Sequence, residues 1–186
     1  MGKLINNGIM KGASGGYGKQ IVFRRGKGQT IIFGGYPTRT APPTEKEKEQ
    51  HERFRLASAY AKRIKENADV WAKYEAKAKG SGRSARTFGI QDFLRPPIIS
   101  HINTRAYSGA VGDKIHIISF DDFDIKSVVV KITASNGKTV ESGDAVFTDG
   151  QWVYTATVAN SPLAGSKIIA TATDLPGNTA EKVITL

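Results

Sequence analysis

The spacing of apolar residues changes from a helical period to a strand period near the middle of the chain. Between Thr44 and Gly80 an apolar row recurs every three or four positions, which is typical of an amphipathic helix. The row consists of Phe54, Ala57, Ala61, Ile64, Ala68 and Trp71. Asn67 and Asp69 are candidates for a break that divides this helix in two. Because the row is narrow and rich in alanine, we expect it to pack against a hairpin, a second helix or another chain.

From Ile98 onward the chain consists of short runs rich in Val, Ile and Thr that are separated by turn residues. Strands are predicted at residues 98–103, 114–120, 127–134, 144–148, 152–157, 167–174 and 181–186. Val128, Val130 and Ile132 alternate along one strand, so one of its faces should be buried. Trp152 and Tyr154 share a face and form the predicted aromatic centre of the core. This rhythm predicts a β-sandwich.

The segment before the helix is rich in glycine. Residues 8–18 contain too much glycine for an unaided helix or regular strand, and we expect an extended arm. The runs 19–25 and 29–33 flank Gly26-Lys27-Gly28, which predicts a β-hairpin with a three-residue turn. A lone hairpin is marginal in water, so it needs its own helix or a neighbouring subunit to cover it.

Capping residues and prolines mark the ends of the helical region. Thr44, with Glu47 three positions later, has the spacing of a capping box and predicts the helix start. Pro96-Pro97 ends the region, after a further short helical turn predicted at residues 87–94. The diproline is the predicted boundary between a docking region, residues 1–95, and a sandwich domain, residues 96–186.

Three motifs of the second half resemble those of bacterial immunoglobulin-like modules, which occur in surface proteins and phage virions. The motifs are Phe120-Asp121-Asp122, Gly150-Gln151-Trp152-Val153-Tyr154 and Asp174-Leu175-Pro176-Gly177-Asn178. The resemblance implies an adhesive, spacer or decoration module, although the cysteine pair of antibody domains is missing. The expected fold class is therefore α+β, with an arm, a hairpin and a long helix followed by an immunoglobulin-like sandwich.

A weaker resemblance concerns the first half of the chain. Ser14-Gly15-Gly16-Tyr17-Gly18, the following Ile21-Val22-Phe23 and the helix with Phe54 are similar to uncharacterised small proteins of gut bacteria and their phages. That similarity implies little about chemistry.

Positive charge is concentrated in the first half. Residues 1–95 contain 20 Lys and Arg and 8 Asp and Glu, whereas residues 96–186 contain 7 and 9. The cluster expected to form a docking patch consists of Lys19, Arg24, Arg25, Lys27 and Arg39, which alternate with aromatic residues. Such a half is expected to meet an acidic partner, either nucleic acid or an acidic protein surface, unless the charges only form a soluble face.

No residue pattern indicates catalysis. The chain has no cysteine, and His51, His101 and His116 lack the paired spacing of metal ligands. Residues 8–19 fail as a phosphate-binding loop because Ala13 stands where the first glycine is needed and the loop precedes a strand. We therefore predict a protein that is not an enzyme, with no cofactor and no small-molecule substrate.

Carboxylates gather in two turns that could share one end of the sandwich. The residues are Asp121, Asp122, Asp124, Asp174 and Asn178. Clustered oxygen atoms of this kind can bind calcium, which needs about 6 to 8 oxygen ligands. The same residues are also common as hydrogen-bonding residues of tight turns. The sequence leaves both interpretations open.

The leading functional hypothesis is a virion component, a capsid-associated or decoration protein of a phage. The first half would anchor to a capsid or other virion protein, or to further copies of the chain, while the sandwich projects outward. The alternatives are a nucleic-acid-binding protein and a bacterial surface adhesion module. The start of the chain has no apolar signal segment, and no run approaches the ~20 apolar residues that cross a bilayer. We therefore expect synthesis in a host cytoplasm and no membrane insertion.

Overall fold

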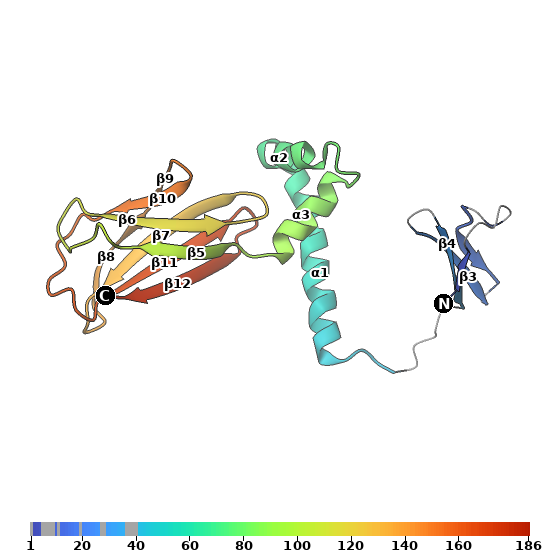
Figure 1. Cartoon of the computed structure of the whole chain (residues 1–186), viewed down its shortest axis with the longest axis horizontal. Coiled ribbons are helices and arrows are strands. Elements are labelled where there is room, and N and C mark those ends of the chain that lie inside the picture. The colour runs from blue at the N-terminus through green and yellow to red at the C-terminus, as the bar shows by residue number, and fades with distance from the viewer. Residues whose placement is uncertain (1, 5–9, 11, 19, 27–28, 36–40) are drawn as a thin grey trace. The chain divides into compact units, whose positions relative to one another are not determined.

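The protein has an α+β fold that divides into two compact units. The computed structural model describes residues 2–4, 10, 12–18, 20–26, 29–35 and 41–186. The first unit comprises Met1–Glu45 and the second Lys46–Leu186. Figure 1 labels most of their helices and strands.

The first unit is built on an antiparallel sheet of four strands. They are β1 (Gly2–Leu4), β2 (Gly15–Tyr17), β3 (Ile21–Gly26) and β4 (Gln29–Gly34), in the order β1-β4-β3-β2. The predicted hairpin is confirmed, because β3 pairs with β4 from Ile21 and Gly34 to Gly26 and Gln29. The prediction that residues 8–18 hold no regular strand is wrong for β2, which pairs with β3. An adjacent strand supplies the backbone hydrogen bonds that a glycine-rich segment cannot provide alone.

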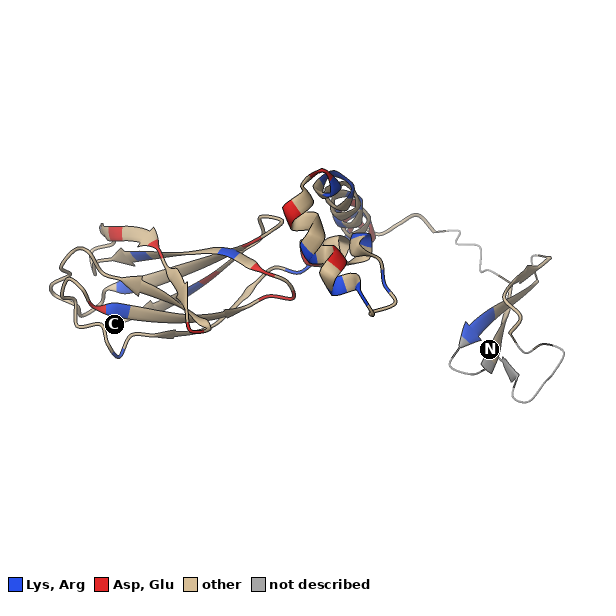
Figure 2. Ribbon diagram, turned by 90° about the horizontal axis from the view of Figure 1, so that it is seen from above, with Lys and Arg blue, Asp and Glu red and all other residues tan. Residues whose placement is uncertain are grey.

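Three α-helices begin the second unit. They are α1 (Glu45–Arg63), which a 3₁₀ turn (Ile64–Glu66) follows, then α2 (Ala68–Ala78) and α3 (Ala85–Leu94). The predicted break is confirmed, because the Asn67 side chain caps α2 by accepting a hydrogen bond from Val70 N at 3.2 Å. Lys and Arg alternate with Asp and Glu along these helices (Figure 2). None of the described helices is long and apolar enough to span a membrane.

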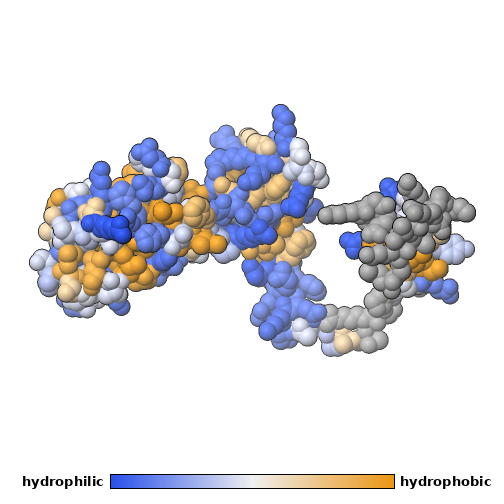
Figure 3. Space-filling view, viewed as in Figure 1, coloured by the Kyte–Doolittle hydropathy of each residue, from blue (hydrophilic) through white to orange (hydrophobic). Residues whose placement is uncertain are grey.

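The helices share a small core formed by Tyr60, Tyr74, Ala85 and Phe88. Of the predicted apolar row, Ala57 and Ala61 are buried, and Gly89 of α3 lies against Ala61. Ile64 and Trp71 are partly buried against the core. The expectation of a continuous seam is wrong at its two remaining positions, since Phe54 and Ala68 are exposed. The N-terminal turns of α1 present a hydrophilic surface (Figure 3).

Eight strands form the rest of the second unit. They are β5 (Ile98–Asn103), β6 (Lys114–Phe120), β7 (Ile125–Thr133), β8 (Thr139–Asp144), β9 (Val146–Thr148), β10 (Gln151–Thr155), β11 (Lys167–Asp174) and β12 (Thr179–Thr185). Two antiparallel sheets result, with the orders β5-β6-β10-β9 and β12-β11-β7-β8. The strand predicted at residues 144–148 is confirmed in part: β9 covers Val146–Thr148, whereas Asp144 is the last residue of β8 in the other sheet. The sequence prediction also missed most of β8.

Both sheets contribute side chains to one apolar core, which makes the arrangement a β-sandwich. Ile115 and Ile117 of β6 and Val128, Val130 and Ile132 of β7 are fully buried. The predicted alternation along β7 is therefore confirmed. The strands β10 and β11 add the buried side chains of Tyr154, Ile168, Ala170 and Ala172, and Trp152 is partly buried beside them.

The helices and the sandwich belong to the same compact unit. Pro96 and Pro97, the predicted domain boundary, link α3 to β5 inside this unit, whereas the two units divide between Glu45 and Lys46. Side chains from both sides of the diproline meet at a junction between the helices and one end of the sandwich, which we call the helix–sandwich junction.

Candidate functional site

The loop between β6 and β7 inserts an aromatic ring into the helical core. Phe123 packs edge-on against Tyr74, with ring centroids 5.2 Å apart, and against Phe88, at 5.7 Å. The Lys77 ammonium lies 5.1 Å from the Phe123 centroid, within the range of a cation–π interaction. A side chain of the sandwich thus completes a core that the helices begin, and this contact fixes the junction.

Two ion pairs hold the same loop against the helices. Arg95 Nη1 lies 2.6 Å from Asp122 Oδ2, and Lys73 Nζ lies 2.6 Å from Asp124 Oδ2. Hydrogen bonds from Gln91 and Arg95 hold the pKa of Asp122 below its usual range. Because all four charged groups are substantially exposed, these pairs orient the loop more than they stabilise it.

Asn178, in the turn between β11 and β12, connects the sandwich to the end of α3. Its side-chain amide donates to Asp174 Oδ2 at 2.7 Å and to the Phe93 carbonyl at 3.2 Å. Asp174 Oδ1 accepts hydrogen bonds from the backbone of Gly177 and Asn178. Burial raises the pKa of the fully buried Asp174, and these hydrogen bonds lower it in part. The turn chemistry expected from the sequence is therefore present at Asp174.

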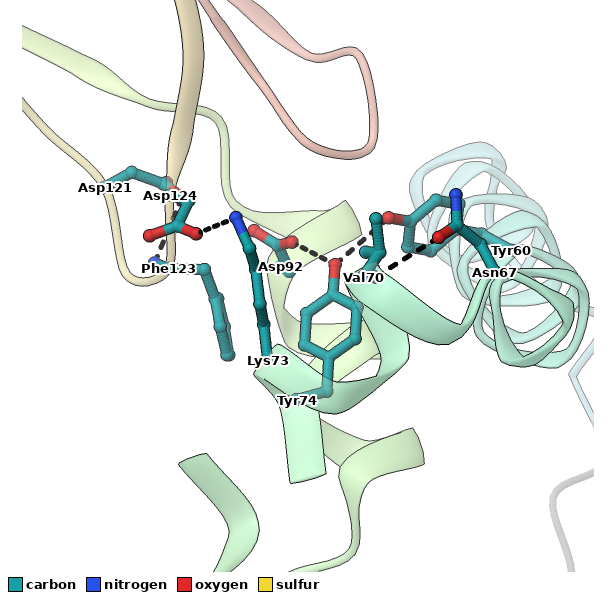
Figure 4. A network of polar contacts seen from close by, with 9 residues as sticks. All are labelled: Tyr60, Asn67, Val70, Lys73, Tyr74, Asp92, Asp121, Phe123 and Asp124. Atoms are coloured by element: carbon teal, nitrogen blue, oxygen red, sulfur yellow. Dashed lines mark hydrogen bonds and ion pairs between the residues drawn. The ribbon is translucent and has the colours of Figure 1, made fainter. Parts of the chain in front are cut away.

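A buried chain of polar groups runs from α1 to α3 (Figure 4). The hydroxyls of Tyr60 and Tyr74 lie 3.0 Å apart, and Tyr74 donates a short hydrogen bond to Asp92 Oδ2. The second oxygen, Asp92 Oδ1, is buried and has no hydrogen-bond partner among the described residues. Burial, with the nearby carboxylates of Asp121 and Asp174, raises the pKa of Asp92 to about 7, against the lowering effect of Tyr74.

Three carboxylates converge at this point. Asp92, Asp121 and Asp174 each place one oxygen so that the three oxygens lie within 4.8 Å of one another. Asp92 and Asp174 are fully buried, and Asp121 is partly buried. Of the five residues predicted as calcium ligands, only Asp121 and Asp174 belong to this cluster.

The other three predicted ligands make different contacts. Asp122 and Asp124 pair with Arg95 and Lys73, and the Asn178 side-chain amide donates to Asp174 of the cluster. Asp92 was not predicted, because a single acidic residue within a helix carries no spacing signal. Its one distinguishing feature in the sequence is that it is the sole acidic residue of α3.

The sheet of the first unit separates the predicted basic patch. Arg24 and Arg25 are adjacent on β3, so their side chains point to opposite faces of the sheet. Arg25 Nε donates to the Gly12 carbonyl at 2.7 Å. Lys19, Lys27 and Arg39 lie outside the described residues, and only the two arginines of the patch are placed.

Both faces of this sheet carry half-buried apolar side chains, which are those of Phe23 and Ile32 on the face of Arg25. On the face of Arg25, the buried Thr30 accepts a hydrogen bond from Gly12 N and donates one to the Met10 carbonyl. On the face of Arg24, the apolar side chains are those of Val22, Ile31 and Phe33, by the pairing of β3 with β4. These three are only half-buried, and no described apolar residue of the first unit is fully buried.

Comparison with known proteins gives no identification. No family model matches the chain, and no curated protein matches it. Among solved structures, it is similar to a crystal structure of an engineered protein, with 20% sequence identity and a TM-score of 0.35. The match covers 48% of this chain and 18% of the engineered protein. A likeness at this level supports no argument about fold family or function.

Proposed function

We propose that the protein is a non-enzymatic structural component of a phage virion, in which the first unit docks on an acidic surface of a shell protein. The observation that carries the proposal is the lack of a fully buried apolar side chain among the described residues of the first unit. A sheet with so little core gains stability when another surface covers it.

The charge of the first unit favours an acidic partner. Residues 1–44 contain seven Lys and Arg and no Asp or Glu. Arg24 shares its face of the sheet with Val22, Ile31 and Phe33, so three apolar side chains lie on the same face as the positive charge of Arg24. Protein interfaces combine an apolar centre with complementary charge at the rim, and this face has both features.

A protein partner fits this face better than nucleic acid does. Nucleic-acid surfaces without sequence preference stack bases on aromatic rings along a basic groove. Two of the three apolar side chains, Val22 and Ile31, are aliphatic and offer no stacking surface. Their burial against another apolar surface would contribute about 25 cal/mol per Å².

The sandwich is proposed to be an immunoglobulin-like module. Its sheet orders, β5-β6-β10-β9 and β12-β11-β7-β8, correspond to the A-B-E-D and G-F-C-C′ orders of that fold. The tryptophan departs from the antibody pattern, because Trp152 lies on β10, the sixth strand of the sandwich and the one in the E position, instead of on strand C. Such a module would serve as a rigid projecting element joined to the anchor.

The test is incorporation into particles. We expect mass spectrometry of purified phage particles from the strain that carries the gene to find the chain in a fixed ratio to the capsid protein. Val22→Asp, which places a carboxylate on the apolar face, should reduce incorporation at least about tenfold, because it buries an unpaired charge. Val111→Asp, at a residue that is 64% exposed in the sandwich unit, should not.

Absence of the chain from the particles would refute the proposal, and so would equal incorporation of the two variants. If the purified chain instead binds DNA or RNA with an affinity that falls steeply with salt, the nucleic-acid alternative gains support.

A further inference from the structure

The carboxylate cluster of the helix–sandwich junction joins three separate parts of the second unit. Asp92 lies on α3, Asp121 follows β6, and Asp174 ends β11 in the other sheet. Their oxygens lie within 4.8 Å of one another. Two oxygens on opposite sides of a calcium ion at 2.4 Å would be about 4.8 Å apart, so one ion can reach all three carboxylates.

An unpartnered buried oxygen points to a missing ligand at this place. Asp92 is fully buried, and its Oδ2 accepts from Tyr74, but its Oδ1 has no hydrogen-bond partner among the described residues. A buried carboxylate oxygen without a partner is costly. In Figure 4 the Asp92 carboxylate lies between Tyr74 and the loop that carries Asp121.

The positive side chains around the junction do not compensate this charge. The ion pairs found among the described junction residues use Lys73 with Asp124 and Arg95 with Asp122. None of the described Lys or Arg side chains forms an ion pair with Asp92, Asp121 or Asp174. Three carboxylates so close together repel one another strongly in a buried place unless a cation or a proton intervenes.

We propose that Asp92, Asp121 and Asp174 bind a divalent cation, calcium, which ties α3 to both sheets of the sandwich. Oxygen-only ligands suit calcium, and water or backbone carbonyls would complete its 6 to 8 positions. Magnesium fits less well, since it demands near-ideal octahedral geometry and keeps several of its waters, whereas calcium accepts carboxylates in flexible arrangements. The site is independent of the docking surface on the first unit, and its proposal goes beyond the proposed function.

Bound calcium would make the junction rigid. Without the ion, the carboxylates favour separation of α3 from the sandwich, whereas with the ion they hold the two together. Because calcium would bind the folded junction and not the unfolded chain, its binding free energy would add to the stability of the second unit.

The test uses the full chain after treatment with a chelator. Thermal unfolding is measured in CaCl₂, in MgCl₂ at the same concentration, and in EDTA, and calcium binding is measured by titration calorimetry. We expect one calcium ion per chain, a rise in Tm with CaCl₂ and a smaller rise with MgCl₂. Asp92→Asn should weaken calcium binding about tenfold or more, because affinity follows the number of charged ligands.

Two further variants keep the test decisive. Asp124→Asn changes a carboxylate of the same loop that lies outside the cluster, and it should keep the calcium response. Asp121→Asn replaces Asp92→Asn if the latter does not fold, since Asp121 is only partly buried. The proposal is overturned if calcium leaves Tm unchanged, if both cluster variants respond like the parent chain, or if Asp124→Asn loses the response.

Discussion

The Phe123 ring offers the sharpest test of how the two parts of the second unit depend on each other. Phe123 comes from the sandwich, yet its neighbours Tyr74 and Phe88 belong to the helical core. Phe123→Ala would remove this shared ring from the helical core and leave the core residues of the sandwich unchanged. We therefore expect the helices to lose stability while the sandwich keeps its own.

The size of the effect follows from burial. Phe→Ala in a full core costs about 3–5 kcal/mol, and the half-buried Phe123 should cost about 2 kcal/mol, part of it from two edge-on ring pairs. Phe120→Ala is the matched control, because its ring is 60% exposed at the end of β6. The control should cost less than about 1 kcal/mol.

The chain contains the reporters that the assay needs. Its two tryptophans are Trp71 in α2 and Trp152 in β10, so Trp71→Phe and Trp152→Phe each leave one reporter. Urea unfolding followed by fluorescence should give coincident transitions in the parent chain, and in Phe123→Ala the Trp71 transition should move to lower urea. Coincident transitions in Phe123→Ala, with a cost no larger than that of Phe120→Ala, would refute this account of the junction.

Two predictions concern the sandwich itself. Gly109→Ala should destabilise it by about 3 kcal/mol in urea unfolding, because φ is +90° and a Cβ would lie 2.4 Å from the Asn160 carbonyl oxygen. Gly112→Ala, with φ +93° and no atom within 4 Å, should cost only about 1–2 kcal/mol, and equal costs would contradict the steric argument. Asp113 accepts hydrogen bonds from the Ser108 side chain and backbone, and these bonds lower the pKa of Asp113. The ionised Asp113 therefore stabilises the folded chain above the ordinary pKa of about 3.9, and this stabilisation is lost as pH falls through the lowered pKa. Asp113→Asn should therefore lower Tm at neutral pH, with a difference that closes in acid; a difference independent of pH would contradict this.

The strands of the sandwich could be predicted because their alternation is strong. β5, β6 and β11 begin and end at the predicted residues. β8 was missed because Val140 is its only large apolar residue, so the strand has no apolar alternation to detect. β8 also lies at the edge of its sheet and pairs with one neighbouring strand only. β2 was missed because glycine removes the pattern altogether.

The helical core was harder to predict because tertiary contacts decide which positions are buried. The apolar row included Phe54, which is exposed, and omitted Tyr60 and Tyr74, whose hydroxyls carry the buried polar chain. In a sequence, tyrosine and aspartate are expected at the surface, because they are buried only where the fold supplies a hydrogen-bond partner. For the same reason the sequence indicated Asp121 and Asp174 but not Asp92, which is close to them only after α3 packs on the sandwich.

The sandwich has the largest core of its own, the helices have a smaller one and the first unit has the least. This order determines which parts can fold without a partner. The sandwich buries apolar residues from both its sheets, the helices bury six apolar residues and need Phe123, and the first unit fully buries no apolar residue among those described. Since stability follows buried apolar area, the sandwich can fold as a support and the helices can fold on that support. The first unit, with its half-buried apolar side chains and its excess of positive charge, has the least core of the three among the described residues, and the proposed docking on a partner would supply the burial that it lacks.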